Sequence, residues 1–138
     1  MSSLSSQPKN LSGQLLAHGI DAVDTVDFLR LLKEPFRSYL DRSFTPTELA
    51  YIGASRNSAE RLAGRFSVKE AVLKALGLGW GDGIAFTDVE TCISAQGAPS
   101  VILHRQVKVV AEEKGIRQWS ISTSHTKLVT IACVIGTN

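Results

Sequence analysis

The spacing of hydrophobic residues changes near the middle of the chain. Before Leu76 most apolar positions recur at helical spacing, which is typical of helices that bury one face. After Ala85 they gather in short runs between glycine, proline and polar turns, which is typical of strands. One strand is expected earlier, at 15–23, where an apolar run ends near Asp21. This order predicts an α+β domain with a mainly antiparallel sheet.

Cap and stop residues give bounds to these elements. Thr45, Pro46 and Glu48 form a strong helix start, because threonine can cap, proline suits the first helical position and glutamate closes a capping box. The first helix can be capped by Asp24 or Thr25. The expected helices cover residues 25–33, 36–40, 46–52, 58–76 (capped by Asn57) and 106–114. The expected strands cover residues 15–23, 85–86, 89–93, 101–103, 119–122 and 129–135.

Length and composition agree with a small globular protein. A chain of 138 residues with 43% hydrophobic and 20% charged residues fits one domain. Residues 1–13 are rich in serine and lack apolar periodicity, so we expect a disordered tail followed by a single domain at 14–138. The net charge of +2 gives no indication of a nucleic-acid or membrane partner.

Processing and redox signals favour the cytoplasm. The N-terminus has neither the apolar nor the basic region of a signal peptide. The longest apolar stretch, 131–135, is too short to cross a bilayer. Cys92 and Cys133 form no C-x-x-C pair, so we expect buried thiols in a reducing compartment rather than a zinc site.

The longest expected helix carries charged residues among its apolar positions. Residues 61–76 are apolar on two sides, which is typical of a mostly buried helix. The polar stripe between these sides consists of Ser67, Glu70 and Lys74. Glu70 and Lys74 are four residues apart and can meet, and a solvated surface pair is the simpler interpretation. Lys69, however, falls within an apolar stripe and Arg65 lies near its edge, which favours a site for a metal and phosphate groups.

Two other polar positions allow more than one interpretation. Asp21 ends a hydrophobic strand, where a carboxylate either caps the next helix or pairs with a charge or a metal. His125 lies among hydroxyl side chains at 122–126, which offer donors to an anion but also suit a plain polar turn. The residues alone leave both alternatives open.

Together these segments resemble the holo-(acyl carrier protein) synthases, the short class of 4′-phosphopantetheinyl transferases. The resemblance runs from His18 to Ile135. It rests on Gly-Ile-Asp at 19–21, on the long segment RLAGRFSVKEAVLKALG at 61–77, and on SISTSHT at 120–126. The resemblance implies the 4′-phosphopantetheinyl transferase fold, with one long buried helix and a homotrimeric assembly.

The same resemblance implies an activity and a set of site residues. Such enzymes transfer the 4′-phosphopantetheine group from coenzyme A to a serine of an apo acyl carrier protein and release 3′,5′-ADP. By resemblance, Asp21 and Glu70 hold Mg²⁺, and together with Lys74 they form the catalytic set. The residues expected to line the coenzyme A site are Arg65, Lys69, Lys74, His125 and Thr126. The serine proton would pass to Glu70 or to a water that Glu70 orients.

The remaining expectations concern the assembly of the chains, the carrier protein and two competing functions. The family's trimers share each site between neighbours, which places Asp21 and Glu70 on one chain and His125 on the next. The basic residues expected to face an acidic carrier of fatty-acid or polyketide synthesis are Arg30, Lys33, Arg37 and Arg42. One alternative is a non-catalytic coenzyme A or nucleotide binding module of the same fold. Another is a structural trimer in which these charges serve only packing.

Overall fold

The computed structural model describes residues 13–31, 33, 35–52, 58–79 and 81–138. The helices are α1 (Thr25–Leu31), α2 (Phe36–Asp41), α3 (Pro46–Ile52), α4 (Ser58–Leu76) and α5 (Arg105–Glu113), with a short 3-10 helix, η2 (Phe86–Asp88). The strands are β1 (Leu15–Asp24), β2 (Val89–Ile93), β3 (Pro99–Leu103), β4 (Gln118–His125) and β5 (Val129–Thr137). The expected α+β class is confirmed, while residues 1–12 of the expected tail and the cap at Asn57 lie outside the described residues.

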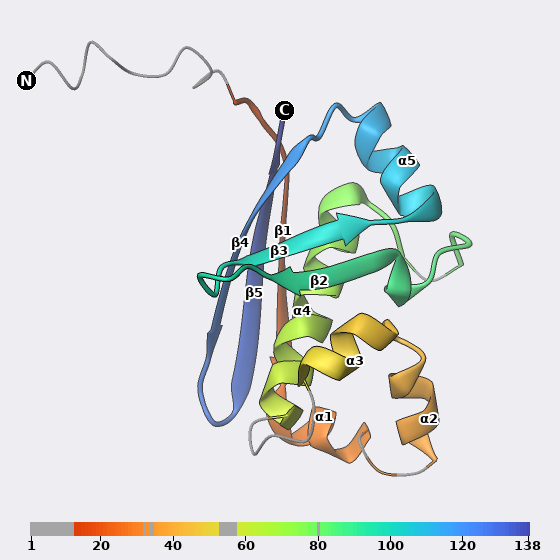
Figure 1. Cartoon of the computed structure of the whole chain (residues 1–138), viewed down its shortest axis with the longest axis vertical. Coiled ribbons are helices and arrows are strands. Elements are labelled where there is room, and N and C mark those ends of the chain that lie inside the picture. The colour runs from red at the N-terminus through yellow and green to blue at the C-terminus, as the bar shows by residue number, and fades with distance from the viewer. Residues whose placement is uncertain (1–12, 32, 34, 53–57, 80) are drawn as a thin grey trace, which may run out of the picture.

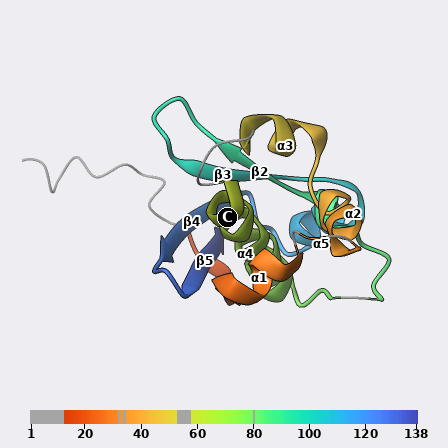
Figure 2. The same ribbon diagram turned by 90° about the horizontal axis from the view of Figure 1, so that it is seen from below.

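The strands form two antiparallel sheets rather than one. The larger sheet has the order β1-β5-β4, and β2 and β3 form a separate two-stranded sheet. Helix α4 lies between the two sheets, as the views in Figure 1 and Figure 2 show together. Because both sides of α4 are covered by strands, most of its surface is buried, which explains its apolar residues on two sides.

Strand β1 lies against α4 with almost no space between the two backbones. A Cβ atom at Gly19 would overlap the carbonyl oxygen of Ala71, so only glycine fits there. Side chains two residues apart on a strand point to the same side. Asp21, two residues after Gly19, therefore also faces α4.

The opposite face of the larger sheet is left exposed by the described part of the chain. In the sheet register Ile20 pairs with Cys133, and Ala22 pairs with Ile131. Ile20 is 63% exposed and Ile131 is 39% exposed. The expectation of two buried thiols is wrong, because Cys133 points outward on this face and Cys92 is only partly buried, both as free thiols.

Local signals for helix starts are confirmed. The Thr45 backbone N–H donates to Glu48 Oε1 at 2.9 Å, and the Glu48 N–H donates to Thr45 Oγ1 at 3.2 Å, which completes the capping box. Asp24 caps α1, since its Oδ1 accepts the N–H of Asp27 at 3.0 Å.

One expected strand is not formed, and another strand is longer than expected. The strand expected at 85–86 is replaced by η2, because the Asp88 N–H donates to the Ala85 carbonyl at 2.9 Å and turns the chain. Strand β4 continues beyond the expected end at 122 and reaches His125, which lies opposite Thr130 of β5. No helix within the described ranges is long and apolar enough to span a membrane.

Candidate active site

Two carboxylates and an ammonium group meet where β1 packs against α4. Lys74 Nζ lies 2.8 Å from Asp21 Oδ1 and 3.4 Å from the carbonyl oxygen of Ile20. Glu70 is one turn earlier on α4, and the charges of both Asp21 and Lys74 act on its carboxyl group. The structure thus brings together the three residues expected to be catalytic. The expected contact between Glu70 and Lys74 is replaced by the ion pair of Lys74 with Asp21.

The ionisation of these groups follows from their surroundings. Burial raises the pKa of Glu70, the negative charge of Asp21 raises it further, and Lys74 opposes both effects. Glu70 also lines a small apolar hollow together with Leu78 and Phe86. The hydrogen bond to Asp21 raises the pKa of Lys74, which keeps the lysine charged at neutral pH.

The donor set of this cluster fits Mg²⁺. Carboxylate oxygens are the ligands this ion prefers, and it usually keeps several waters, so two carboxylates are enough. The described residues contain no group of three or more histidine, cysteine and acidic side chains that could hold a metal. A cation beside Asp21 and Glu70 would relieve the repulsion that raises the pKa of Glu70.

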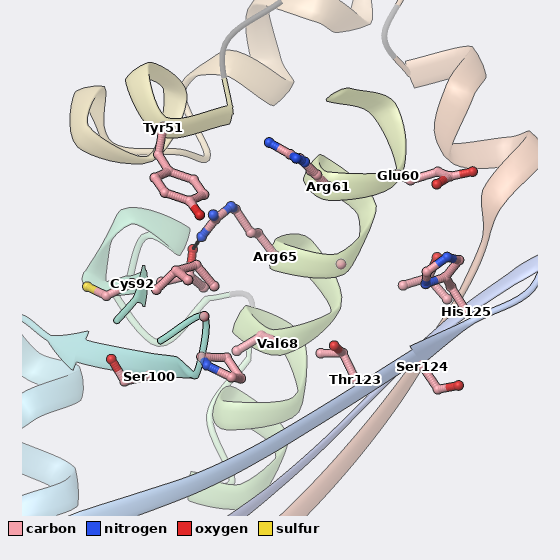
Figure 3. A pocket seen from close by; sticks show the side chains of 16 residues that line it. Tyr51, Glu60, Arg61, Arg65, Val68, Cys92, Ser100, Thr123, Ser124 and His125 are labelled. Carbon is pink, nitrogen blue, oxygen red and sulfur yellow. Dashed lines mark hydrogen bonds between the residues drawn. The ribbon is translucent and has the colours of Figure 1, made fainter. Parts of the chain in front are cut away.

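A larger cavity of about 440 Å³ opens on another side of α4. Figure 3 shows side chains from α3, α4, β2, β3 and β4 around it. The residues that α4 contributes are Glu60, Arg61, Gly64, Arg65 and Val68, and the end of β4 contributes Thr123, Ser124 and His125. At about 100° per residue, Glu70 points away from the α4 residues that line this cavity.

Arg65 is the most buried cation that lines the cavity. It is 8% exposed, and its Nη1 atom donates to Thr91 Oγ1 at 2.9 Å. The guanidinium carbon lies 4.8 Å from the centre of the Tyr51 ring, a cation–π contact. Its Nε atom is buried without a hydrogen-bond partner among the described residues. Burial lowers the pKa of Arg65, but an arginine side chain stays charged in proteins.

Lys69, which was expected to line the coenzyme A site, is not among the described side chains that line the cavity. Its side chain is fully buried. Its Nζ atom donates to Glu48 Oε1 at 2.7 Å and to the carbonyl oxygens of Phe86 at 3.0 Å and Val89 at 2.6 Å. These acceptors use all three ammonium donors, so none is left for a ligand. Burial lowers the pKa of Lys69, and the charge of Glu48 opposes this effect.

The expected residues at the end of β4 differ in their positions. His125 is exposed and lines the cavity. Thr126 closes the turn that follows, because its Oγ1 atom accepts the backbone N–H groups of Leu128 at 3.2 Å and Val129 at 3.1 Å. Its side chain is not among those that line the cavity.

Comparison with known proteins decides the family. Residues 17–132 match the model of the 4′-phosphopantetheinyl transferase superfamily. The chain belongs to this superfamily. A holo-[acyl-carrier-protein] synthase of Thermoanaerobacter sp. (strain X514) is 38% identical over 118 residues, which cover 86% of this chain and 84% of that protein.

Solved structures of the same superfamily share the fold. The holo-[acyl-carrier-protein] synthase of Neisseria meningitidis superposes with a TM-score of 0.80 at 28% identity, over 91% of this chain and all of that one. The Helicobacter pylori enzyme, solved in complex with coenzyme A, gives 0.73 at 29% identity, over 86% of this chain and 98% of that one.

In this phosphopantetheinyl transferase the expected site residues form two groups. One group is Asp21, Glu70 and Lys74, and the other contains Arg65 and His125 at the cavity. A single chain does not bring the two groups together, because α4 presents them on different faces.

Sequence reasoning missed two polar side chains. Arg61 lines the cavity one helical turn before Arg65, and this spacing of four residues was a usable signal. Glu48 was expected only to close the capping box, yet it also binds Lys69 and Thr91. No local pattern indicates these contacts.

Proposed function

We propose that this chain transfers the 4′-phosphopantetheine group from coenzyme A to a serine of an apo acyl carrier protein. The observation that carries the proposal is the cluster of Asp21, Glu70 and Lys74, in a chain that belongs to the phosphopantetheinyl transferase superfamily. Relatives named holo-[acyl-carrier-protein] synthase, one of them in complex with coenzyme A, support the substrate pair.

The chemistry needs charge neutralisation more than covalent participation by the protein. The serine oxygen forms a bond to the phosphorus that bears the pantetheine, the bond from that phosphorus to the 3′,5′-ADP oxygen breaks, and the serine proton leaves. In this proposal the Lys74 ammonium, which Asp21 binds, neutralises charge that develops on the leaving phosphate. Glu70, or a water that Glu70 orients, is our candidate for the base that takes this proton.

Asp21 and Glu70 would hold Mg²⁺ in this proposal. When bound, the cation supplies positive charge to the pyrophosphate oxygens. Neither carboxylate is fully buried, so water can complete the ligand set.

The cavity is the proposed place for the phosphate-bearing end of coenzyme A. Arg65 offers its guanidinium at the wall of the cavity, and His125 adds a ring N–H donor. Thr126 lies next to His125 and would contribute its hydroxyl from the turn.

We also propose a homotrimer with shared sites. The uncovered sheet face with Ile20 and Ile131 is apolar enough to pack against a second copy of the chain. In this proposal the Asp21 group of one chain completes a site with the cavity of its neighbour. The separation of the two groups on α4 supports this arrangement.

The carrier protein would approach the basic side chains near α1 and α2. Arg30 pairs with Asp27 at 3.4 Å and Arg37 pairs with Asp41 at 2.9 Å. The exposed residues Lys33 and Arg42 have no ion-pair partner among the described residues and would meet an acidic carrier of fatty-acid or polyketide synthesis. We place the reaction in the cytoplasm, where such carriers and coenzyme A are available.

One experiment separates this proposal from a binding module of the same fold. The full chain is incubated with coenzyme A, Mg²⁺ and several apo carrier proteins, and each carrier is weighed by mass spectrometry. A transferase adds the mass of one phosphopantetheine group to at least one carrier. Binding of coenzyme A without any gain in carrier mass would leave the non-catalytic binding module as the better description.

A further inference from the structure

Glu48 has a second role beyond the start of α3. The residue is 1% exposed, and both carboxylate oxygens accept hydrogen bonds. Oε1 accepts from the Thr45 N–H and from Lys69. Oε2 accepts the Thr91 N–H at 3.1 Å and is also in hydrogen-bond contact with the Thr91 hydroxyl. The carboxylate is therefore held rigidly from three directions.

The direction of the hydrogen bonds through Thr91 is fixed by chemistry. A guanidinium can only donate, so the Thr91 oxygen accepts from Arg65 Nη1. The single hydroxyl proton of Thr91 then points to Glu48 Oε2. A carboxylate strengthens this bond because it is charged. Arg65, Thr91 and Glu48 thus form a chain of donors that ends on a buried negative charge.

No carboxylate among the described residues is in direct contact with the Arg65 guanidinium. Arg65 and Lys69 are cationic and buried, Glu48 is the buried anion between them, and the charge of Glu90 also acts on Lys69. Lys69 binds Glu48 directly, whereas Arg65 reaches it only through the Thr91 hydroxyl. The Arg65 charge therefore stays available to an anion in the cavity that this residue lines.

We propose that Glu48 and Thr91 are positioning residues that fix the Arg65 guanidinium for a phosphate group of coenzyme A. Tyr51 packs against the guanidinium, and the Thr91 hydroxyl holds one of its nitrogens in place. The ligand then meets a donor that has already lost its freedom of rotation, which strengthens binding. The inference rests on the proposed function, in which the cavity takes coenzyme A.

The test removes only the hydroxyl of Thr91. Thr91→Val keeps the volume of the side chain, and its backbone N–H still binds Glu48, so the buried ion pair with Lys69 is preserved. Thr91→Ser restores a hydroxyl. Thr25→Val is the matched control, because Thr25 is a buried threonine of α1 whose hydroxyl has no partner among the described residues.

Two measurements without any carrier protein report the result. Calorimetry gives the Kd for coenzyme A, and NMR gives the rotation rate of the Arg65 guanidinium about its Nε–Cζ bond. We expect Thr91→Val to weaken coenzyme A binding about tenfold and to speed the rotation. Thr91→Ser and Thr25→Val should match the original chain. In an Arg65→Lys background, Thr91→Val should cause little further loss, because Thr91 acts through Arg65.

Three outcomes would overturn the positioning role. They are unchanged affinity in Thr91→Val, equal losses in the presence and absence of Arg65, and an original chain that binds no coenzyme A. A chain that shows the expected pattern but modifies no carrier would overturn the transferase proposal alone.

Discussion

The ammonium of Lys74 lies 2.8 Å from the carboxylate of Asp21, and this contact joins α4 to β1 across 53 positions of sequence. The Asp21 side chain is 11% exposed, whereas that of Lys74 is 54% exposed. The lysine therefore binds a partner that is nearly buried while its own chain stays in contact with solvent. Such a lysine can reach a phosphate from the solvent side, but its departure leaves the nearly buried Asp21 carboxylate in need of another cation.

Replacing Asp21 by asparagine should abolish transfer while the fold survives. The substitution keeps the shape of the side chain but removes one of two proposed metal-binding carboxylates, so we expect a loss of about 100-fold or more. The readouts are the mass of the carrier and the melting temperature. Removing Mg²⁺ with a chelator should have the same effect on the original chain. Full activity in Asp21→Asn, judged against the exposed control Glu112→Gln, would refute the metal assignment.

Lys69→Met should damage stability rather than coenzyme A binding. The buried Glu48 carboxylate would lose its charged partner, which costs about 3–5 kcal/mol in the free energy of unfolding. Urea denaturation measures this loss, and adding Glu48→Gln should recover part of it. Lys108→Met, which removes an exposed pair with Glu112, should change stability by less than about 0.5 kcal/mol. A stable Lys69→Met variant with weakened coenzyme A binding would restore Lys69 as a ligand.

The contribution of Glu90 to stability should depend on pH. The hydrogen bond from the Thr45 hydroxyl at 2.6 Å lowers the pKa of Glu90, and His104 lowers it further against the effect of burial. A lowered carboxyl pKa means that the stabilisation is present above the unfolded value of about 4.3 and is lost as pH falls through the folded value.

Urea denaturation of Glu90→Gln across pH 3 to 7 checks the direction in which this stabilisation changes with pH. The variant should be less stable than the original chain by about 1.5 kcal/mol near neutral pH, and the difference should shrink in acid. Glu112→Gln, on the solvent side of α5, should show no such trend. A difference that grows as the pH falls would contradict the lowered pKa of Glu90.

Mixing two inactive variants should regain activity if sites are shared between chains. Glu70→Gln damages the cluster near β1, and His125→Ala damages the cavity. After the two are unfolded and refolded together, random assembly leaves about one quarter of the shared sites intact. Carrier modification by the mixture, compared with each variant refolded alone, measures this recovery. A mixture that assembles normally but stays inactive would place both groups of residues in one chain's own site.

Features encoded by neighbouring residues could be predicted from the sequence. The capping box of Thr45 and Glu48 and the stop of α4 before Gly77 depend on contacts within a few positions. The separate sheets could not be predicted in this way, because β1 pairs with β5 at the other end of the sequence. The 3-10 turn η2 was missed although its contacts are local, since the Ala85 N–H donates to Asp88 Oδ2 three residues later.

The charged residues of α4 also show that contacts between distant residues are harder to predict than contacts between neighbours. The pattern indicated that Lys69 needs an anionic partner, but not that Glu48, 21 positions earlier, would supply it. A pair four residues apart on a helix contributes only about 0.3–0.5 kcal/mol, so Lys74 was free to bind Asp21 instead of Glu70. Distant contacts of this kind depend on the packing of β1 and β2 against α4, which the order of residues does not show.

The contact between Gly19 and Ala71 makes the spacing of the Asp21 cluster independent of side-chain packing. Where two backbones touch, the distance between them is set by bond lengths and atomic radii, which hardly vary between proteins. Core side chains elsewhere can grow or shrink during evolution without moving Asp21 toward or away from α4. Position 19 itself cannot change in this way, because any side chain there would overlap the Ala71 carbonyl. The distance between Asp21 and α4 therefore depends on a glycine.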